Sequence, residues 1–238
     1  MRKMKGSSNY LKNQVRKNLA KAALCLLVFF LIFIAAGLQT LRTMRLDVLV
    51  EGALLFSLAP LVASYYFWRK YHIFSGGWEG EKKVVELLGS RLSDDYILLN
   101  DLYLQGGGGD IDHVVLAPGG IFVLETKNWK GVVSCNGDVW NRPGKNGFKG
   151  SPSRQANRNA ATIKRIVDSS PTLRQLNIWV EGIVVFTNSH ATLHLSNPTV
   201  QVIKLPQLPN HIITQGKTER YTREQLEAVG KELLRQRR

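Results

Sequence analysis

Charged residues interrupt an apolar stretch between Asp110 and Lys127, which reads DIDHVVLAPGGIFVLETK. Two apolar runs flank the Pro-Gly-Gly segment at 118–120, and this pattern predicts a β-hairpin. Because side chains alternate along a strand, Glu125 and Lys127 are expected on one face, with Thr126 on the other. The sequence therefore places an acid and a base side by side at the end of an apolar strand.

Acidic residues also occur on the first strand of this hairpin, where Asp110 and Asp112 share a face with Val114. A register that joins the two faces would bring an aspartate close to Glu125 and Lys127. Three charged groups on a core-facing side are costly to bury unless something binds them. Two carboxylates suit Mg²⁺, which keeps several waters, and a lysine could hold the attacking water or neutralise phosphate charge.

The alternative is that Glu125 and Lys127 are solvated residues on the open face of a hairpin, because the pattern Glu-x-Lys is common. The rest of the chain decides between the two interpretations.

Basic charge is concentrated in the first third of the 238-residue chain, which has a formal net charge of +14. Residues 1–74 hold 11 Lys and Arg against 2 acidic residues, and they include the apolar segments Ala22–Leu38 and Val48–Trp68. These lengths predict two transmembrane helices at 22–68 after a basic N-terminus at 1–21. A pair of buried soluble helices, or a signal peptide for the first segment, remains an alternative.

The distribution of basic residues predicts the orientation of this membrane hairpin. Seven Lys and Arg precede the first segment, and Arg69 and Lys70 follow the second. The positive-inside rule therefore places both termini in the cytoplasm and the short connection outside, in a two-span protein of the cell membrane. Cys25 lies in a span and Cys135 in an expected strand, so no disulfide framework is indicated.

The remainder reads as alternating strands and helices. Gly76-Gly77 is interpreted as a linker, followed by a helix at 78–92 that has Glu81 in its first turn, where the helix dipole favours an acid. Further strands are expected at 96–104, 131–135, 138–140, 178–187 and 200–205, and helices at 153–170, 206–215 and 222–238. The run Gly106–Gly109 lacks the features of a phosphate loop and is interpreted as a turn. This order predicts an α/β or α+β domain with a mixed sheet.

A basic loop at 141–151 and the helix after it supply candidate nucleic-acid contacts. The cations are Arg142, Lys145 and Lys149 in the loop and Arg158 on the helix. Contacts to a phosphate backbone need such residues, although a solvated loop and helix face would look the same.

The ordered set of motifs resembles the PD-(D/E)xK nuclease superfamily, and more closely the NERD (nuclease-related) domain. The matching pieces are GWEGE at 77–81, IDHVV at 111–115, GIFVLETKN at 120–128 and GIVVF at 182–186, together with Trp140 and Gln155. The resemblance implies a restriction-endonuclease-like fold, a mixed sheet flanked by helices, with the domain at 76–205 and a C-terminal helical extension at 206–238. The usual proline before the aspartate is replaced by Ile111.

Carried over by residue, the resemblance implies that Asp112 and Glu125 bind Mg²⁺ or Mn²⁺ and that Lys127 is the catalytic lysine. Glu81 would be the auxiliary acid and Gln155 the polar residue of the following helix, while Asp110 could replace Asp112 as ligand. His113 is expected to face away and to be structural.

The function implied is a membrane-anchored, metal-dependent nuclease that hydrolyses phosphodiester bonds in the cytoplasm, with DNA favoured as substrate. A non-catalytic module that binds nucleic acid or a partner at the membrane is the main alternative, and a purely assembly role is a third. The sequence does not indicate the oligomeric state.

Overall fold

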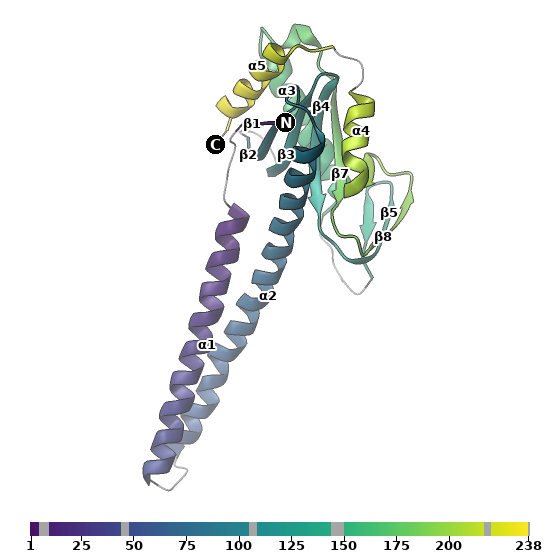
Figure 1. Ribbon diagram of the computed structural model, residues 1–238. Helices are drawn as coiled ribbons and strands as arrows, with labels where there is room; N and C mark the ends of the chain where they lie inside the picture. The colour runs from purple at the N-terminus through teal and green to yellow at the C-terminus, as the bar shows by residue number, and fades with distance from the viewer. Residues whose placement is uncertain (5–9, 44–47, 105–108, 144–149, 217–219, 238) are drawn as a thin grey trace. The chain divides into compact units, whose positions relative to one another are not determined.

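The computed structural model describes residues 1–4, 10–43, 48–104, 109–143, 150–216 and 220–237 (Figure 1). The chain divides into two compact units, of which one comprises Met1–Ser8 with Glu79–Arg238 and the other Asn9–Trp78. The predicted basic residues Lys145 and Lys149, and most of the glycine run at 106–109, lie outside the described residues.

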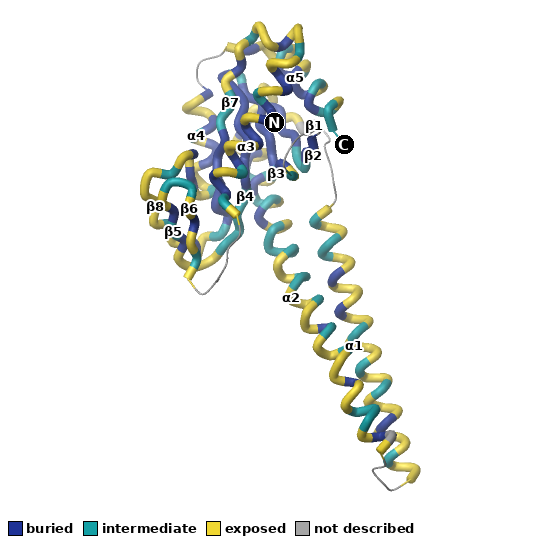
Figure 2. Tube along the Cα trace, turned by 180° about the vertical axis from the view of Figure 1, so that it is seen from behind, coloured by how far each residue is buried: buried dark blue, intermediate teal, exposed yellow. Residues whose placement is uncertain are grey.

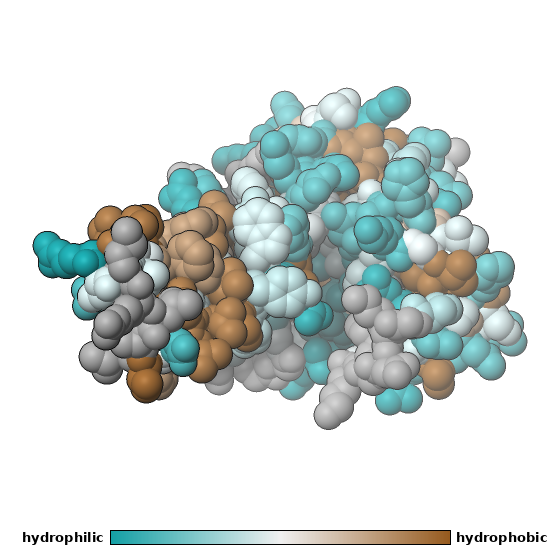
Figure 3. Space-filling model, turned by 90° about the horizontal axis from the view of Figure 1, so that it is seen from below, coloured by the Kyte–Doolittle hydropathy of each residue, from teal (hydrophilic) through white to brown (hydrophobic). Residues whose placement is uncertain are grey.

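Two long helices make up the second unit. Helix α1 spans Tyr10–Thr43 and α2 spans Val48–Arg91, and both are long and apolar enough to cross a membrane. Only 11% of the most apolar stretch of each helix is buried, which differs from a core helix of a soluble protein. Figure 3 shows hydrophobic side chains gathered over these helices on the face in view.

Helix α2 corrects two details of the sequence interpretation. It continues without interruption through Gly76 and Gly77, so these glycines do not form a linker. Glycine lowers helix propensity by about 1 kcal/mol per residue, which neighbouring turns of a long helix can offset. Glu81 consequently lies in the interior of α2, and the helix dipole at an N-terminus does not explain it.

A six-stranded mixed sheet forms the centre of the first unit, in the order β1-β2-β3-β4-β7-β9. Strands β2, β3 and β4 pair antiparallel, whereas the pairs β1-β2, β4-β7 and β7-β9 are parallel. The bounds are β1 Arg2–Met4, β2 Ile97–Tyr103, β3 Asp110–Ala117, β4 Gly120–Lys127, β7 Val180–Phe186 and β9 Gln201–Lys204.

A second, three-stranded sheet consists of β6 (Val139–Asn141), β5 (Gly131–Asn136) and β8 (Ala191–Ser196) in that order. The expectation of a mixed sheet with helices is confirmed, while β1, β8 and the separate small sheet were not predicted.

Helices cover both faces of the large sheet. Helices α3 (Pro152–Ser169) and α5 (Arg223–Arg235) pack on one face, and α4 (Leu208–Gln215) and the C-terminal part of α2 pack on the other. Short 3₁₀ turns occur at Arg174–Leu176 and Leu205–Gln207. Figure 2 shows the buried strands between exposed helix faces. Helices α4 and α5 contribute to the same core as the sheet, so residues 206–238 are part of this unit.

Gly182 allows α3 to approach β7 closely. A Cβ atom at this position would lie 2.8 Å from the Ala156 carbonyl oxygen and 2.9 Å from its carbon. Because those atoms belong to the helix backbone, a side chain at 182 would displace the whole helix. The distance of α3 from the sheet therefore depends on this glycine.

We expect Gly182→Ala to destabilise the protein by about 1–3 kcal/mol through overpacking. The measurement is the thermal unfolding midpoint of the full chain in detergent. Gly89→Ala is the matched control, because no atom lies within 4 Å of a Cβ there and alanine is the better helix former. Equal midpoints for the two variants would contradict this account of the α3–β7 contact.

Candidate active site

Pairing between β3 and β4 brings Asp112 opposite Glu125. The register pairs His113 with Leu124 and Val114 with Val123, so the next pair along is Asp112 with Glu125. The backbone N–H of Thr126 donates a 2.7 Å hydrogen bond to Oδ2 of Asp112. Directly opposed residues of an antiparallel pair have neighbouring side chains on one face. The sequence required a register that joins the two polar faces to bring these carboxylates together, and the structure has such a register.

Lys127 completes the group from the same strand. Its ammonium forms a hydrogen-bonded ion pair with Oε1 of Glu125, and the two side chains are 18% and 2% exposed. Burial alone would lower the pKa of Lys127, but the charges of Glu125 and Asp112 outweigh it and raise the pKa above its ordinary value. Lys127 is therefore protonated at neutral pH.

Glu125 has one oxygen available for a ligand. Burial, followed by the charge of Asp112, raises the pKa of Glu125 to about 8, and Lys127 opposes this shift. Its Oε2 atom is buried and has no hydrogen-bond partner. Since buried polar atoms are nearly always paired, this orphaned acceptor fits the coordination of a cation.

Few protein side chains at this site are placed to bind a metal ion. Within the described parts of the chain, no group of three or more His, Cys, Asp or Glu side chains is arranged to hold a metal. Asp112 and Glu125 could supply two hard oxygen ligands, with water completing the shell as Mg²⁺ prefers.

Glu81 lies in the part of α2 that belongs to the first unit, beyond the apolar segment that ends at Trp68. Burial raises the pKa of Glu81 to about 9, and the charge of Asp112 is the next largest cause. The charge of Glu81 in turn contributes to the raised pKa of Lys127. Helix α2 therefore adds a third carboxyl group to the surroundings of this site.

Two further aspartates lie nearby, and one of them was not recognised in the sequence. Asp110 is exposed, whereas Asp112 is partly buried and hydrogen-bonded to β4, so the geometry favours Asp112 over Asp110 as the ligand. On β2, Asp101 lies between residues that pair with His113 and Ile111, at the level of Asp112.

Asp101 has a left-handed backbone with φ of 52°, uncommon for a residue other than glycine. Burial, then the charge of Asp112, raises the pKa of Asp101 to about 6. The signal in the sequence was the polar pair Asn100-Asp101 inside an apolar strand.

Helix α3 brings Arg158 near the carboxylates, and Gln155 lies three residues before it on the same helix. The charge of Arg158 acts to lower the pKa of Glu125, which indicates that its guanidinium is close to the site. Asn159 on the same helix donates a 3.4 Å hydrogen bond to the carbonyl of Asp110. Gln155 is partly buried and lines a surface groove with Arg158.

Arg142 stacks on an aromatic ring that follows the strand of Lys127. Its guanidinium carbon is 4.6 Å from the centroid of Trp129, and the ammonium of Lys127 is 5.9 Å from the same centroid. Trp129 packs edge-to-face on Trp140 and Phe186, which fixes its ring. Trp129 was not predicted, although it follows Lys127 by two residues.

His113 takes no part in this group. Its side chain is 1% exposed and its Nδ1 atom lies 2.8 Å from Oδ1 of Asn100. Burial lowers the pKa of His113 to about 3, so the ring is neutral, in agreement with a structural role.

The raised carboxyl pKa values give a pH dependence of stability in the presence of a chelator. At pH 7 the folded protein retains protons on Glu125 and Glu81 that the unfolded chain has already lost, and it releases them as the pH rises through about 8 and about 9. Stability must therefore fall as pH rises through this window. We expect the thermal midpoint of the full chain to decrease from pH 7 to pH 9, whereas buried neutral His113 affects only the acid side.

Glu125→Gln removes one of these titrations and should make the decrease with pH shallower. Glu86→Gln, at an exposed position of α2 whose side chain is 62% exposed, should leave the slope unchanged. A midpoint that is constant or rises from pH 7 to 9 in the unmodified protein would contradict the buried carboxyl cluster.

Comparison with known proteins gives one match to a family model. Residues 76–187 match the family model described as NERD, nuclease-related domain. The match includes Glu81, Asp112, Glu125, Lys127 and Gln155. No curated protein and no solved structure gives a significant match. Residues 76–187 of this chain therefore form a nuclease-related domain.

Proposed function

We propose that the protein is a metal-dependent nuclease of the PD-(D/E)xK type that hydrolyses phosphodiester bonds of nucleic acid, with DNA as the favoured substrate. The observation that carries the proposal is the convergence of Asp112, Glu125 and Lys127 at the open end of the β3–β4 pair within a nuclease-related domain. The set combines two hard oxygen ligands with one cation, which suits phosphate chemistry.

Asp112 and Glu125 would hold Mg²⁺ or Mn²⁺. When bound, such an ion supplies a Lewis acid for a phosphoryl oxygen and lowers the pKa of a coordinated water. The orphaned Oε2 of Glu125 and the hydrogen bond that orients Asp112 both support this assignment.

Lys127 acts as a hydrogen-bond donor in this proposal. Because the charges of Glu125 and Asp112 raise the pKa of Lys127, its side chain is protonated at neutral pH and is suited to donate hydrogen bonds. Its ammonium would orient the attacking water or stabilise the negative charge that grows on phosphate. Glu81 and Gln155 would position water and substrate from α2 and α3.

Basic residues outside the carboxylate group would contact the nucleic-acid backbone. Arg142 is supported by Trp129, and no carboxylate pairs with it among the described residues. Arg158 is exposed on α3 beside Glu125. Neither guanidinium forms an ion pair with a carboxylate among the described residues, so both can donate hydrogen bonds to a phosphate without first losing such a partner.

The helical unit would anchor the domain to the cell membrane from the cytoplasmic side, with two spans and both termini inside. Strand β1 precedes α1 and pairs parallel with β2, which follows α2. Segments on either side of the two apolar helices therefore belong to one unit. Strands β1 and β2 can pair only if they lie on the same side of the membrane, which requires an even number of crossings. The excess of Lys and Arg before α1 places that side in the cytoplasm.

Lys127→Ala should greatly slow cleavage while leaving DNA binding intact. We expect plasmid cleavage by the full chain in detergent with Mg²⁺ or Mn²⁺, none with chelator, and a loss of about 100-fold in rate for the variant, as for removal of one transition-state donor. Lys130→Ala, an exposed lysine nearby, is the control and should cleave normally. Binding without metal-dependent cleavage in the unmodified protein would favour the non-catalytic alternative.

Cysteine labelling tests the proposed orientation. In a chain with Cys25 and Cys135 replaced by alanine, Leu41→Cys near the end of α1 should react with a membrane-impermeant maleimide in sealed, right-side-out vesicles. Arg235→Cys on α5 should react only after the vesicles are opened. Labelling of Arg235→Cys in sealed vesicles would refute the orientation.

A further inference from the structure

A groove of about 450 Å³ opens at the start of α3, next to the candidate active site. Its polar lining comes from β6, its preceding turn and the first two turns of α3: Asp138, Trp140, Ser151, Arg154, Gln155 and Arg158. Arg158 connects the groove to the carboxylates, because it lines the groove and its charge acts on Glu125.

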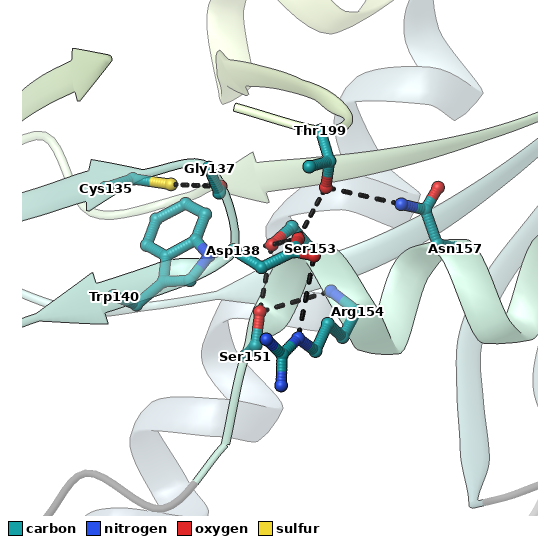
Figure 4. A network of polar contacts seen from close by, with 9 residues as sticks. All are labelled: Cys135, Gly137, Asp138, Trp140, Ser151, Ser153, Arg154, Asn157 and Thr199. Atoms are coloured by element: carbon teal, nitrogen blue, oxygen red, sulfur yellow. Dashed lines mark hydrogen bonds and ion pairs between the residues drawn. The ribbon is translucent and has the colours of Figure 1, made fainter. Parts of the chain in front are cut away.

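A hydrogen-bond network makes one wall of the groove rigid (Figure 4). The buried Ser153 hydroxyl donates a 2.6 Å hydrogen bond to Oδ1 of Asp138 and accepts one of 3.0 Å from the indole N–H of Trp140. The Thr199 hydroxyl also donates to Oδ1 of Asp138. These donors hold the pKa of Asp138 below its ordinary value and fix its carboxylate.

Arg154 is held loosely against this wall. Its Nε atom lies 3.5 Å from Oδ2 of Asp138, the oxygen that the hydroxyl groups leave free, and its side chain is 72% exposed. An exposed ion pair at this distance contributes little stability, so the guanidinium can exchange Asp138 for a stronger partner. A phosphate is such a partner, because it accepts paired hydrogen bonds from a guanidinium.

We propose that this groove binds a backbone phosphate of the nucleic-acid strand adjacent to the scissile bond, with Arg154 as its principal contact. The inference rests on the proposed function for the identity of the ligand. Gln155 and Arg158 lead the strand from this phosphate toward Asp112 and Glu125. Asp138 orients Arg154 in the free protein, and the ion pair between them breaks when the nucleic-acid strand binds.

Binding is tested with the full chain in detergent, a fluorescein-labelled 20-bp DNA duplex and chelator to prevent cleavage. Arg154→Gln should weaken binding roughly fivefold at low salt and reduce the slope of log K against log salt by about 0.9, the value for one phosphate contact. The matched control is Arg165→Gln, an exposed arginine of α3 that does not line the groove. Equal affinities for these two variants would overturn the proposal.

Asp138→Asn provides a test that a loss of folding cannot imitate. Asparagine keeps the Oδ1 acceptor for Ser153 and Thr199 but removes the charge and the acceptor for Arg154. With repulsion removed and Arg154 released, DNA affinity should rise about twofold to fivefold. If Asp138→Asn has an unaltered thermal midpoint but its DNA affinity is unchanged or lower, phosphate binding in the groove is refuted.

Cleavage kinetics separate this inference from the proposed function. With Mg²⁺, Arg154→Gln should raise KM and leave kcat nearly unchanged, whereas Lys127→Ala should lower kcat. If the protein cleaves DNA but Arg154→Gln and Asp138→Asn leave its DNA affinity unchanged, the phosphate site in the groove is refuted and the nuclease function is not. Binding through the groove without any cleavage would support the groove and refute the nuclease.

Discussion

The antiparallel register of β3 against β4 is the constraint on which the site depends. A slip of one residue would turn Asp112 to the opposite face of the sheet, away from Glu125. Both strands are apolar on both faces, so polarity alone fixes the register weakly. The turn is therefore important, and the C-terminal region holds it: the N–H groups of Arg220 and Tyr221 donate to the carbonyl of Pro118 at 2.9 and 3.0 Å. A Cβ atom on Gly119 would lie 2.5 Å from Cα of Gly216, so the end of α4 rests directly on the turn.

This anchoring explains how an apolar hairpin can carry charged groups at its open end. The turn end is buried and locked, and the opposite end can hold Asp112, Glu125 and Lys127 in a fixed arrangement. Burial opposes the ionisation of each carboxyl group, and Lys127 offsets only part of this cost. The carboxylates of Asp112 and Glu125 would therefore carry more negative charge than Lys127 neutralises, and a divalent cation would supply the missing positive charge.

Local patterns in the sequence were sufficient for the hairpin and for most elements around it, because alternation and turn residues act over short distances. The helix expected from residue 222 begins at Arg223, where Thr222 and Gln225 form a capping box. Features that depend on tertiary contacts were not visible. Asp101 is part of the site only because β2 pairs with β3, and β1 exists only because β2 offers an edge to the N-terminal residues. Glu81 was identified, but with the wrong physical reason, since the sequence did not show that α2 continues through Gly76 and Gly77.

Helix α3 shows how one packing contact links the site to the groove. Ala156, Ile163 and Val167 lie on its buried side, and the close approach at Gly182 sets its distance from the sheet. The 3.6-residue periodicity then fixes where its polar side chains point. Arg154 and Arg158 are four residues apart and share an exposed side, on which Gln155 adjoins them. A displacement of α3 would move all three together relative to Asp112 and Glu125, which lie on β3 and β4. The packing contact at Gly182 therefore sets how far these polar side chains lie from the carboxylates.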